Sequence, residues 1–327
     1  MRLRDPDLRQ AAPAVAAAFG LDVELGLPVE GLTPGETAPT GRTVSLEQAD
    51  PAQVAAGWDS EDTVRLREWN YDDGRVEAAL ERHPLLGFRL FADGYGDYAV
   101  SPDGTAIRCA PPPDVEGWLW QRCLIGQVLP LAVVLQGLEA FHAAAVAIDG
   151  RAVGLVGAST AGKSSVAVHL VLRGAELLAD DVLALEPDGA RLEVQPGPGV
   201  VSVRHPEARR LGEAGLARLG TVLGDDGEAL RVRVERAPRP LPLAALYFLD
   251  RGDAERTTFE RLWPPDPRLL LGSTFTHMVV TPERLTNQLD ACTRLAHGTP
   301  LFRASVAPET GAAELAAALE THLRAHT

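Results

Sequence analysis

The chain contains the run Gly157-Ala158-Ser159-Thr160-Ala161-Gly162-Lys163-Ser164 directly after the apolar residues 152–156. In a G-x-x-x-x-G-K-S sequence the glycines let backbone N–H groups converge on phosphate oxygens, and the positive N-terminal end of the following helix adds to the attraction. The residues before the run predict a strand, and residues 164–173 predict a helix that ends at Gly174. This context disfavours a glycine-rich turn that matches the motif by accident.

The motif predicts a task for each of its groups. Residues 157–165, which end at Ser165, are expected to bind a nucleoside triphosphate. Lys163 is expected to reach the β- and γ-phosphates, and Ser164 to bind Mg²⁺ through its hydroxyl. Lys163 is the only lysine among the 31 basic residues, and the others are all arginine. Chance would place it at this position about one time in thirty, which supports the motif independently.

The residues on both sides of the motif predict antiparallel strands. Residues 143–148 and 152–156 are apolar and are joined by Asp149-Gly150, the dipeptide favoured in a two-residue hairpin turn. Residues 176–186 predict one strand, which turns at residues 187–189 and returns along residues 191–195. In most phosphate-loop proteins the strand before the loop starts a parallel sheet without such a hairpin, so this sequence predicts a mixed α/β fold.

Asp180 and Asp181 lie 17 and 18 residues beyond Lys163, after the apolar run 177–179. One carboxylate beside a phosphate loop can hold Mg²⁺ and a second can take the proton of an attacking hydroxyl, whereas the alternative is a solvated strand end. Adjacent strand residues point to opposite faces, so both can serve one site only at a strand end or a distortion. His142 and Arg204 are further candidates, each with a structural or exposed alternative.

Composition limits the class of protein and its partners. The formal net charge of -14 and 46% hydrophobic content indicate a globular chain that would repel nucleic acid, so a basic peptide or a neutral small molecule fits better. Cys109, Cys123 and Cys292 are widely separated and odd in number, which predicts reduced thiols in the cytoplasm and no cysteine metal site. The charged N-terminus predicts no export signal.

The chain is expected to form two domains: 1–112, a candidate for acceptor recognition, and 113–327, which binds the nucleotide and carries the catalytic residues. Short runs such as 21–25, 87–91 and 97–100 predict a β-rich N-terminal domain, residues 31–42 a loop, and the prolines at 111–113 a boundary. Residues 115–137 predict a helix kinked near Pro130, whose apolar part, 124–138, is too short to cross a membrane. Trp118 and Trp120 are expected in the core or at a subunit interface.

Residues 138–186 resemble the catalytic domain of the HPr kinase/phosphorylase family. The resemblance is carried by Phe141-His142-Ala143-Ala144-Ala145-Val146, the loop, and Ala179-Asp180-Asp181, in the same order and at similar spacing. It implies a phosphate-loop kinase core related to phosphoenolpyruvate carboxykinase, which uses ATP and Mg²⁺ to phosphorylate serine. It also implies that Asp180 is the general base, that His142 orients it, and that Ser164 and Asp181 hold the metal.

Other segments depart from that family. Where it carries a Glu-Ile-Arg-Gly signature, this chain reads Gly199-Val200-Val201-Ser202-Val203-Arg204, so phosphorolysis and recognition of HPr are not implied. Other segments are more similar to shorter HPr-kinase-like proteins, some of which phosphorylate the precursors of lasso peptides. This looser resemblance is carried by Phe19-Gly20-Leu21, Leu27-Pro28, residues 91–101 and Gly126-Gln127-Val128-Leu129-Pro130.

Three functions emerge as hypotheses. The first is a kinase for a serine of a peptide or small protein, the second is a kinase for a small-molecule alcohol, and the third is a nucleotide-dependent switch. The family also implies self-association. Neither the acceptor nor the choice between ATP and GTP can be read from the sequence, because the loop contacts phosphates and not the base.

Overall fold

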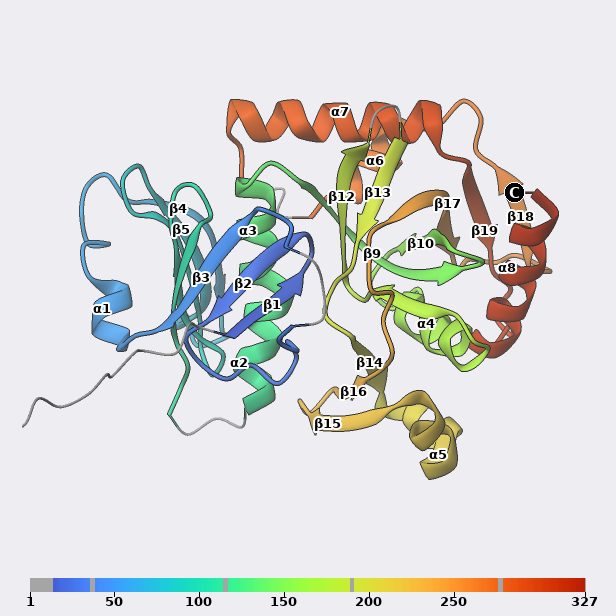
Figure 1. Cartoon of the computed structure of the whole chain (residues 1–327), viewed down its shortest axis with the longest axis horizontal. Helices are drawn as coiled ribbons and strands as arrows, with labels where there is room; N and C mark the ends of the chain where they lie inside the picture. Colours follow the sequence, from blue (N-terminus) through green and yellow to red (C-terminus); the bar gives the residue numbers. More distant parts are fainter. Residues whose placement is uncertain (1–13, 36–38, 114–116, 189–190, 276–278, 327) are drawn as a thin grey trace, which may run out of the picture.

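The computed structural model describes residues 14–35, 39–113, 117–188, 191–275 and 279–326. Two large sheets lie on either side of a long helical segment, and a three-stranded sheet with one helix projects below them (Figure 1). The mixed α/β class predicted from the sequence is therefore confirmed at this level.

The N-terminal sheet has the strand order β1-β2-β3-β8-β7-β6-β5-β4 in the described chain. The strands predicted at 21–25, 87–91 and 97–100 are confirmed as β2, β6 and β7. In the predicted loop, residues 36–38 lie outside the described chain, and the remainder holds only a bridge from Ala16 to Pro34. The elements are β1 (Ala14–Ala18), β2 (Leu21–Leu25), β3 (Thr43–Gln48), α1 (Pro51–Ala55), β4 (Val64–Asn70), β5 (Val76–His83), β6 (Gly87–Ala92), β7 (Gly96–Val100) and β8 (Ala106–Ala110).

A continuous helical segment covers one face of this sheet. It consists of α2 (Gly117–Cys123), the π-helical turn η1 (Leu124–Val128) and α3 (Leu129–Leu135). The predicted helix is thus present from residue 117, and residues 115 and 116 lie outside the described chain. Its apolar side packs with residues of β2, β3, β7 and β8 in one hydrophobic core. The helical segment therefore belongs physically to the N-terminal sheet, although it comes after the predicted boundary at 111–113.

The same segment, Gly117–Leu135, is long and apolar enough to cross a membrane by length and composition. This differs from the sequence-based expectation, because the helix begins earlier than the apolar residues 124–138. In the structure, 67% of its most apolar stretch is buried against the protein. Its packing is that of a core helix, with Trp120 buried in the hydrophobic core as expected.

The second large sheet carries the glycine-rich loop. β9 (Glu139–Ile148) and β10 (Arg151–Gly157) form the predicted antiparallel hairpin, and the turn residues Asp149 and Gly150 both have positive φ. β10 also pairs in parallel with β17 (Leu241–Asp250). β9 also pairs with β12 (Val182–Asp188), and β12 pairs with β13 (Arg191–Gln195). The pairings β10-β9-β12-β13-β17 return to β10 and so close into a ring. Antiparallel and parallel neighbours on the two edges of β10 hold the start of the loop firmly.

The strand predicted at residues 176–186 is divided in two. β11 (Glu176–Ala179) and β12 (Val182–Asp188) are separated at Asp180 and Asp181, because Asp181 has φ of 67°, which no regular strand permits. β13 (Arg191–Gln195) returns antiparallel to β12 as predicted, and residues 189 and 190 of the turn lie outside the described chain.

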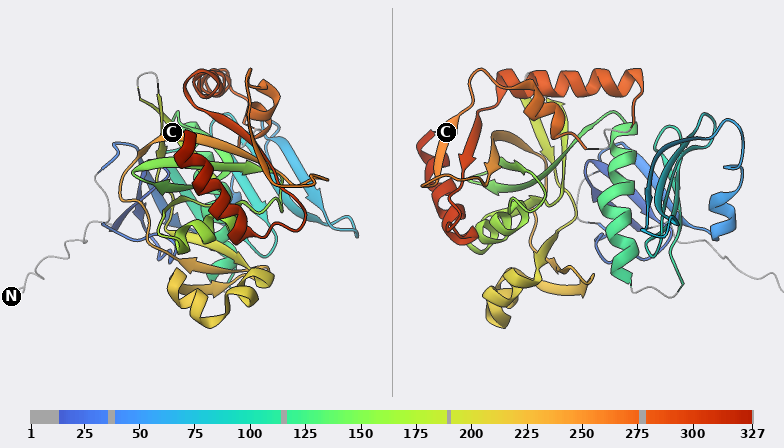
Figure 2. Two further views of the ribbon diagram at one scale, coloured as in Figure 1. Left: turned by 90° about the vertical axis from the view of Figure 1, so that its right-hand side faces the viewer. Right: turned by 180° about the vertical axis from the view of Figure 1, so that it is seen from behind.

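The remaining elements lie outside this ring (Figure 2). The predicted helix after the loop is confirmed as α4, and the three-stranded sheet has the order β14-β16-β15. The elements are α4 (Lys163–Leu172), β14 (Val200–Arg204), α5 (His205–Leu219), β15 (Thr221–Asp225), β16 (Ala229–Arg233), β18 (Thr258–Arg261), α6 (Pro267–Gly272), α7 (Pro282–Gly298), β19 (Leu301–Ser305) and α8 (Ala312–His326).

A buried ion pair joins β9 to α7. Arg284 Nη2 lies 2.9 Å from Glu139 Oε1, and both side chains are at most 3% exposed. Arg284 also donates a hydrogen bond to the carbonyl of Phe275, whose own N–H donates to Ala140 of β9. Burial raises the pKa of Glu139 to about 7, although Arg284 opposes this shift.

This pair predicts a pH dependence of stability. An unfolded glutamate loses its proton near pH 4.5, whereas Glu139 keeps its proton in the folded chain until about pH 7. The folded state therefore holds the additional proton, and the free energy of unfolding falls as pH rises between these values. We expect the stability of wild type relative to Glu139→Gln to decrease between about pH 5.5 and about pH 7.5 in urea denaturation. Asp290→Asn, at the exposed pair with Arg294, is the control; parallel curves for wild type and Glu139→Gln would contradict the assignment.

Candidate active site

The glycine-rich loop connects β10 to α4 through a backbone that only certain residues allow. Gly162, the residue before α4, has φ of 96°, and Thr160 has φ of 71°. A Cβ on Gly157 would lie 2.9 Å from the carbonyl oxygen of Leu249, so this position has no room for a side chain. Arg251 Nε donates to the carbonyl of Ala161 at 3.0 Å and braces the loop from the end of β17. The loop is thus shaped by its glycines and supported from outside.

Lys163 lies at the first position of α4 and points back under the loop. Its Nζ lies 3.0 Å from the carbonyl oxygen of Gly157 and 3.3 Å from that of Ala158. It also lies 3.1 Å from Nε2 of His142. Burial lowers the pKa of Lys163, and the nearby Asp181 and Asp180 oppose this shift. The ammonium group is therefore held in place before any ligand arrives.

His142 lies on β9, opposite Val182 of β12. Its Nδ1 lies 3.1 Å from the carbonyl oxygen of Asp181, so this nitrogen carries the proton and donates. Nε2 is then free to accept from Lys163. Burial lowers the pKa of His142, and the charge of Lys163 lowers it further, which favours this neutral form. In the structure His142 therefore positions Lys163 and the Asp181 backbone, rather than hydrogen-bonding to the Asp180 carboxylate.

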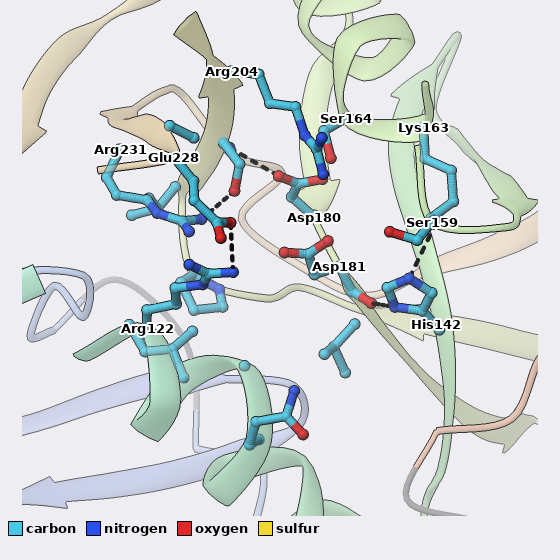
Figure 3. Close-up of a pocket in the computed structure, with 18 of the residues that line it drawn as sticks. Arg122, His142, Ser159, Lys163, Ser164, Asp180, Asp181, Arg204, Glu228 and Arg231 are labelled. Atoms are coloured by element: carbon cyan, nitrogen blue, oxygen red, sulfur yellow. Dashed lines mark hydrogen bonds and ion pairs between the residues drawn. The ribbon is translucent and has the colours of Figure 1, made fainter. Parts of the chain in front are cut away.

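The break between β11 and β12 directs the carboxylates of Asp180 and Asp181 into the same region. Val182 N donates to the carbonyl of Asp180 at 2.9 Å, and the positive φ of Asp181 reverses the usual alternation of side chains. The Asp180 carboxylate lies beside Ser164 and Arg204, and the Asp181 carboxylate lies between this group and His142 (Figure 3). This is the distortion that the sequence required if both acids serve one site.

Asp180 is the more enclosed of the two acids. Its Oδ2 accepts a hydrogen bond of 2.8 Å from the Ser202 backbone, while its Oδ1 is buried without a hydrogen-bond partner among the described residues. Burial and the neighbouring Asp181 raise the pKa of Asp180 to about 6, against the hydrogen bond from the Ser202 backbone and the nearby Ser164 hydroxyl. A buried carboxylate oxygen without a donor is costly, so this atom is suited to a bound cation or hydroxyl.

Sequence reasoning missed a polar chain that leads away from Asp180. Arg231 on β16 donates to the Ser202 hydroxyl and pairs with the buried Asp226. Arg122 on α2 lies 3.5 Å from Asp226 and 3.0 Å from Glu228. These residues carry no motif, and they meet only because the small sheet folds back against α2.

A cavity of about 490 Å³ joins these groups. Of the residues predicted for the site, His142, Ser159, Thr160, Gly162, Lys163, Ser164, Ser165, Asp180, Asp181 and Arg204 line the cavity. The other loop residues, Gly157, Ala158 and Ala161, shape the backbone around Lys163. The opposite wall is formed by α2 and η1, including Trp118, Arg122 and Gly126. The cavity therefore lies between the loop and the helical segment of the N-terminal unit.

The oxygen groups of the cavity are of the type that Mg²⁺ prefers. Ser164, Asp180 and Asp181 offer only oxygen donors, and the unpartnered Oδ1 of Asp180 belongs to a carboxylate that contacts Ser164. No group of three or more histidine, cysteine or acidic side chains that could hold a metal occurs within the described residues. In sites that bind nucleotides, Mg²⁺ commonly uses one or two protein oxygens and takes its other ligands from phosphates and water.

Comparisons with known proteins add little. No protein-family model and no curated protein matches the sequence. Among solved structures, the HPr(Ser) kinase/phosphatase from Coxiella burnetii is similar over 57% of this chain and 89% of that chain, with 16% identity and a TM-score of 0.31. A likeness this weak assigns neither fold family nor activity.

The enclosed charge of Asp180 predicts a gain in stability on neutralisation. We expect Asp180→Asn to raise the free energy of unfolding of the ligand-free protein by roughly 1–3 kcal/mol at about pH 8, because a desolvated charge is removed. Chemical denaturation measures this. Asp188→Asn, on the exposed end of β12, is the control and should change little. A destabilised Asp180→Asn protein would show that the carboxylate is satisfied in the fold.

Proposed function

We propose that the protein is an ATP- and Mg²⁺-dependent kinase that transfers the γ-phosphate to a hydroxyl group, with a peptide or small-protein serine as acceptor. The observation that carries the proposal is the enclosed Asp180 carboxylate, with one unpartnered oxygen, beside Ser164 in the cavity that also contains Lys163. A switch protein would need a metal ligand and a group that orients water. It would not need a second acid directed into a cavity of this size.

The positive groups are placed for the phosphates of the donor. Residues 157–165 would surround the triphosphate with backbone N–H groups at the start of α4. Lys163 would exchange its contacts with the loop carbonyls for the β- and γ-phosphates, while His142 keeps its direction. Arg204, which lines the same cavity, would balance charge on the phosphoryl group in transit.

The two acids would divide proton removal and metal binding. In the proposed step the acceptor hydroxyl gives its proton to Asp180, its oxygen bonds to the γ-phosphorus, and the bond to the leaving nucleoside diphosphate breaks. The pKa of about 6 suits a base that is ionised near neutral pH. Ser164 and Asp181 would hold Mg²⁺, which when bound draws negative charge from the phosphates. Since Asp180 also contacts Ser164, its share in metal binding is open to test.

Paired substitutions separate donor binding from transfer. We expect Lys163→Ala to weaken binding of a fluorescent ATP analogue by at least about tenfold, because a charged contact to phosphate is lost. Asp180→Asn should bind the analogue within about threefold of wild type yet transfer phosphate about 10²–10⁴-fold more slowly.

Arg173→Ala, near the C-terminal end of α4, is the matched control and should bind the analogue normally. Transfer at the wild-type rate by Asp180→Asn would exclude Asp180 as the base. Weaker analogue binding by this variant only when Mg²⁺ is present would instead identify Asp180 as a metal ligand.

The negative charge of the protein predicts that the acceptor peptide is basic. The chain is acidic overall, and the exposed Glu228 lies at the cavity, so basic residues near the acceptor serine should assist binding. We expect the KM for a basic serine peptide to rise severalfold between about 0.05 and about 0.5 M salt. A neutral peptide of equal length serves as the control. Equal salt dependence of the two peptides would argue against electrostatic recognition.

A further inference from the structure

The wall of the cavity opposite the loop is a π-helical turn. In η1 the N–H of Leu129 donates to the carbonyl of Leu124, five residues earlier, in place of the usual four. Pro130 comes next and has no N–H, so the carbonyl of Gly126 lacks its α-helical donor. Single π turns within α-helices occur frequently at functional sites. Here Ile125, Gly126 and Gln127 of this turn line the cavity.

Gly126 has no structural reason to be glycine. Its φ is not positive, and a Cβ built on it would meet no atom within 4 Å. By contrast, Gly104 and Gly31, which lie against the same helical segment, have no room for a Cβ. Glycine weakens a helix, and neither backbone conformation nor packing explains it at residue 126. What glycine preserves there is open space in the cavity, facing the phosphate loop.

The neighbouring Gln127 supplies polar groups to the same space. It is exposed, and its amide has no hydrogen-bond partner within the described residues. A glutamine amide offers both a donor and an acceptor, which is the pair that a peptide backbone requires. Glu228, whose side chain is 66% exposed, adds a carboxylate at the rim through its pair with Arg122. The wall thus combines the open space at Gly126, the amide of Gln127 and the negative charge of Glu228.

We propose that the π turn Leu124–Val128 forms the acceptor-binding wall, with Gly126 leaving room for a peptide segment that carries the serine and Gln127 pairing with its backbone. This inference rests on the proposed kinase function and deepens it, because it assigns acceptor selection to the N-terminal unit. Gln127 and Glu228 are exposed at the rim of the cavity, so an acceptor peptide can enter and leave the cavity there. A small alcohol would not need such an opening.

Substitution at Gly126 tests this wall. The probes are a serine-centred peptide library with varied flanking residues, a set of small alcohols, and a fluorescent ATP analogue. Gly126→Leu should lower transfer to the best peptide by at least about tenfold, mainly by raising KM, because the side chain occupies the peptide's space. Binding of the analogue and slow hydrolysis of ATP should stay within about twofold of wild type.

Two further variants distinguish an effect on peptide binding from a folding defect. Gln127→Ala removes an exposed amide and should raise the peptide KM by severalfold with unchanged melting temperature. Gly272→Leu, on α6, is the matched control: its Cβ also meets no atom within 4 Å, and Gly272 does not line the cavity. It should transfer phosphate as wild type does.

The possible outcomes distinguish the wall from the activity. Peptide transfer by Gly126→Leu at the wild-type rate would overturn the proposed wall and leave the kinase function standing. Transfer by wild type to small alcohols alone would overturn the peptide acceptor while still supporting a kinase. A wild-type protein that binds and hydrolyses ATP but phosphorylates no probe would overturn both proposals together.

Discussion

The cavity depends on holding a single ammonium group inside the protein. Lys163 is 6% exposed, so water contributes little to its solvation. Two loop carbonyls, the neutral ring of His142 and the field of two carboxylates replace that water. These partners come from different strands and loops, and the pairing of β9 with β10 and with β12 brings them together. The ring of strands therefore brings together the groups that replace water around the Lys163 ammonium group.

Two of the four residues other than glycine that have positive φ in the described chain lie where the chemistry is proposed. Thr160 and Asp181 have positive φ although both carry side chains, a conformation that costs free energy for residues other than glycine. Asp180 adds a desolvated carboxylate to this cost. The surrounding sheet, with its buried alanine and valine residues on β9 and β10, supplies the packing that maintains this arrangement. Such a site is suited to bind ligands that relieve its unpaired charge.

Local sequence signals predicted the loop, the Asp149-Gly150 hairpin, α4 and the return of β13, because each depends on residues that are close in the chain. The break at Asp180 and Asp181 was expected only on the condition that both acids serve one site, because aspartate tolerates a positive φ but does not require one. The contacts of Arg231 and Arg122 were missed. They depend on the way the small sheet folds against α2, and no short-range pattern encodes that approach. No role for Gly126 could be predicted from the sequence, because the open space beside it exists only in the folded chain.

The lone lysine also has a consequence for the chemistry of the molecule as a whole. All other basic side chains are guanidinium groups or imidazoles, so the protein surface offers no lysine amine to acyl donors, carbamylating agents or enzymes that attach acyl groups and protein tags to lysine. The one such amine lies inside the cavity, where it is 6% exposed and hydrogen-bonded to two loop carbonyls. Acylation of lysine in this protein is consequently confined to one atom, and its extent reports directly whether the cavity is open or filled.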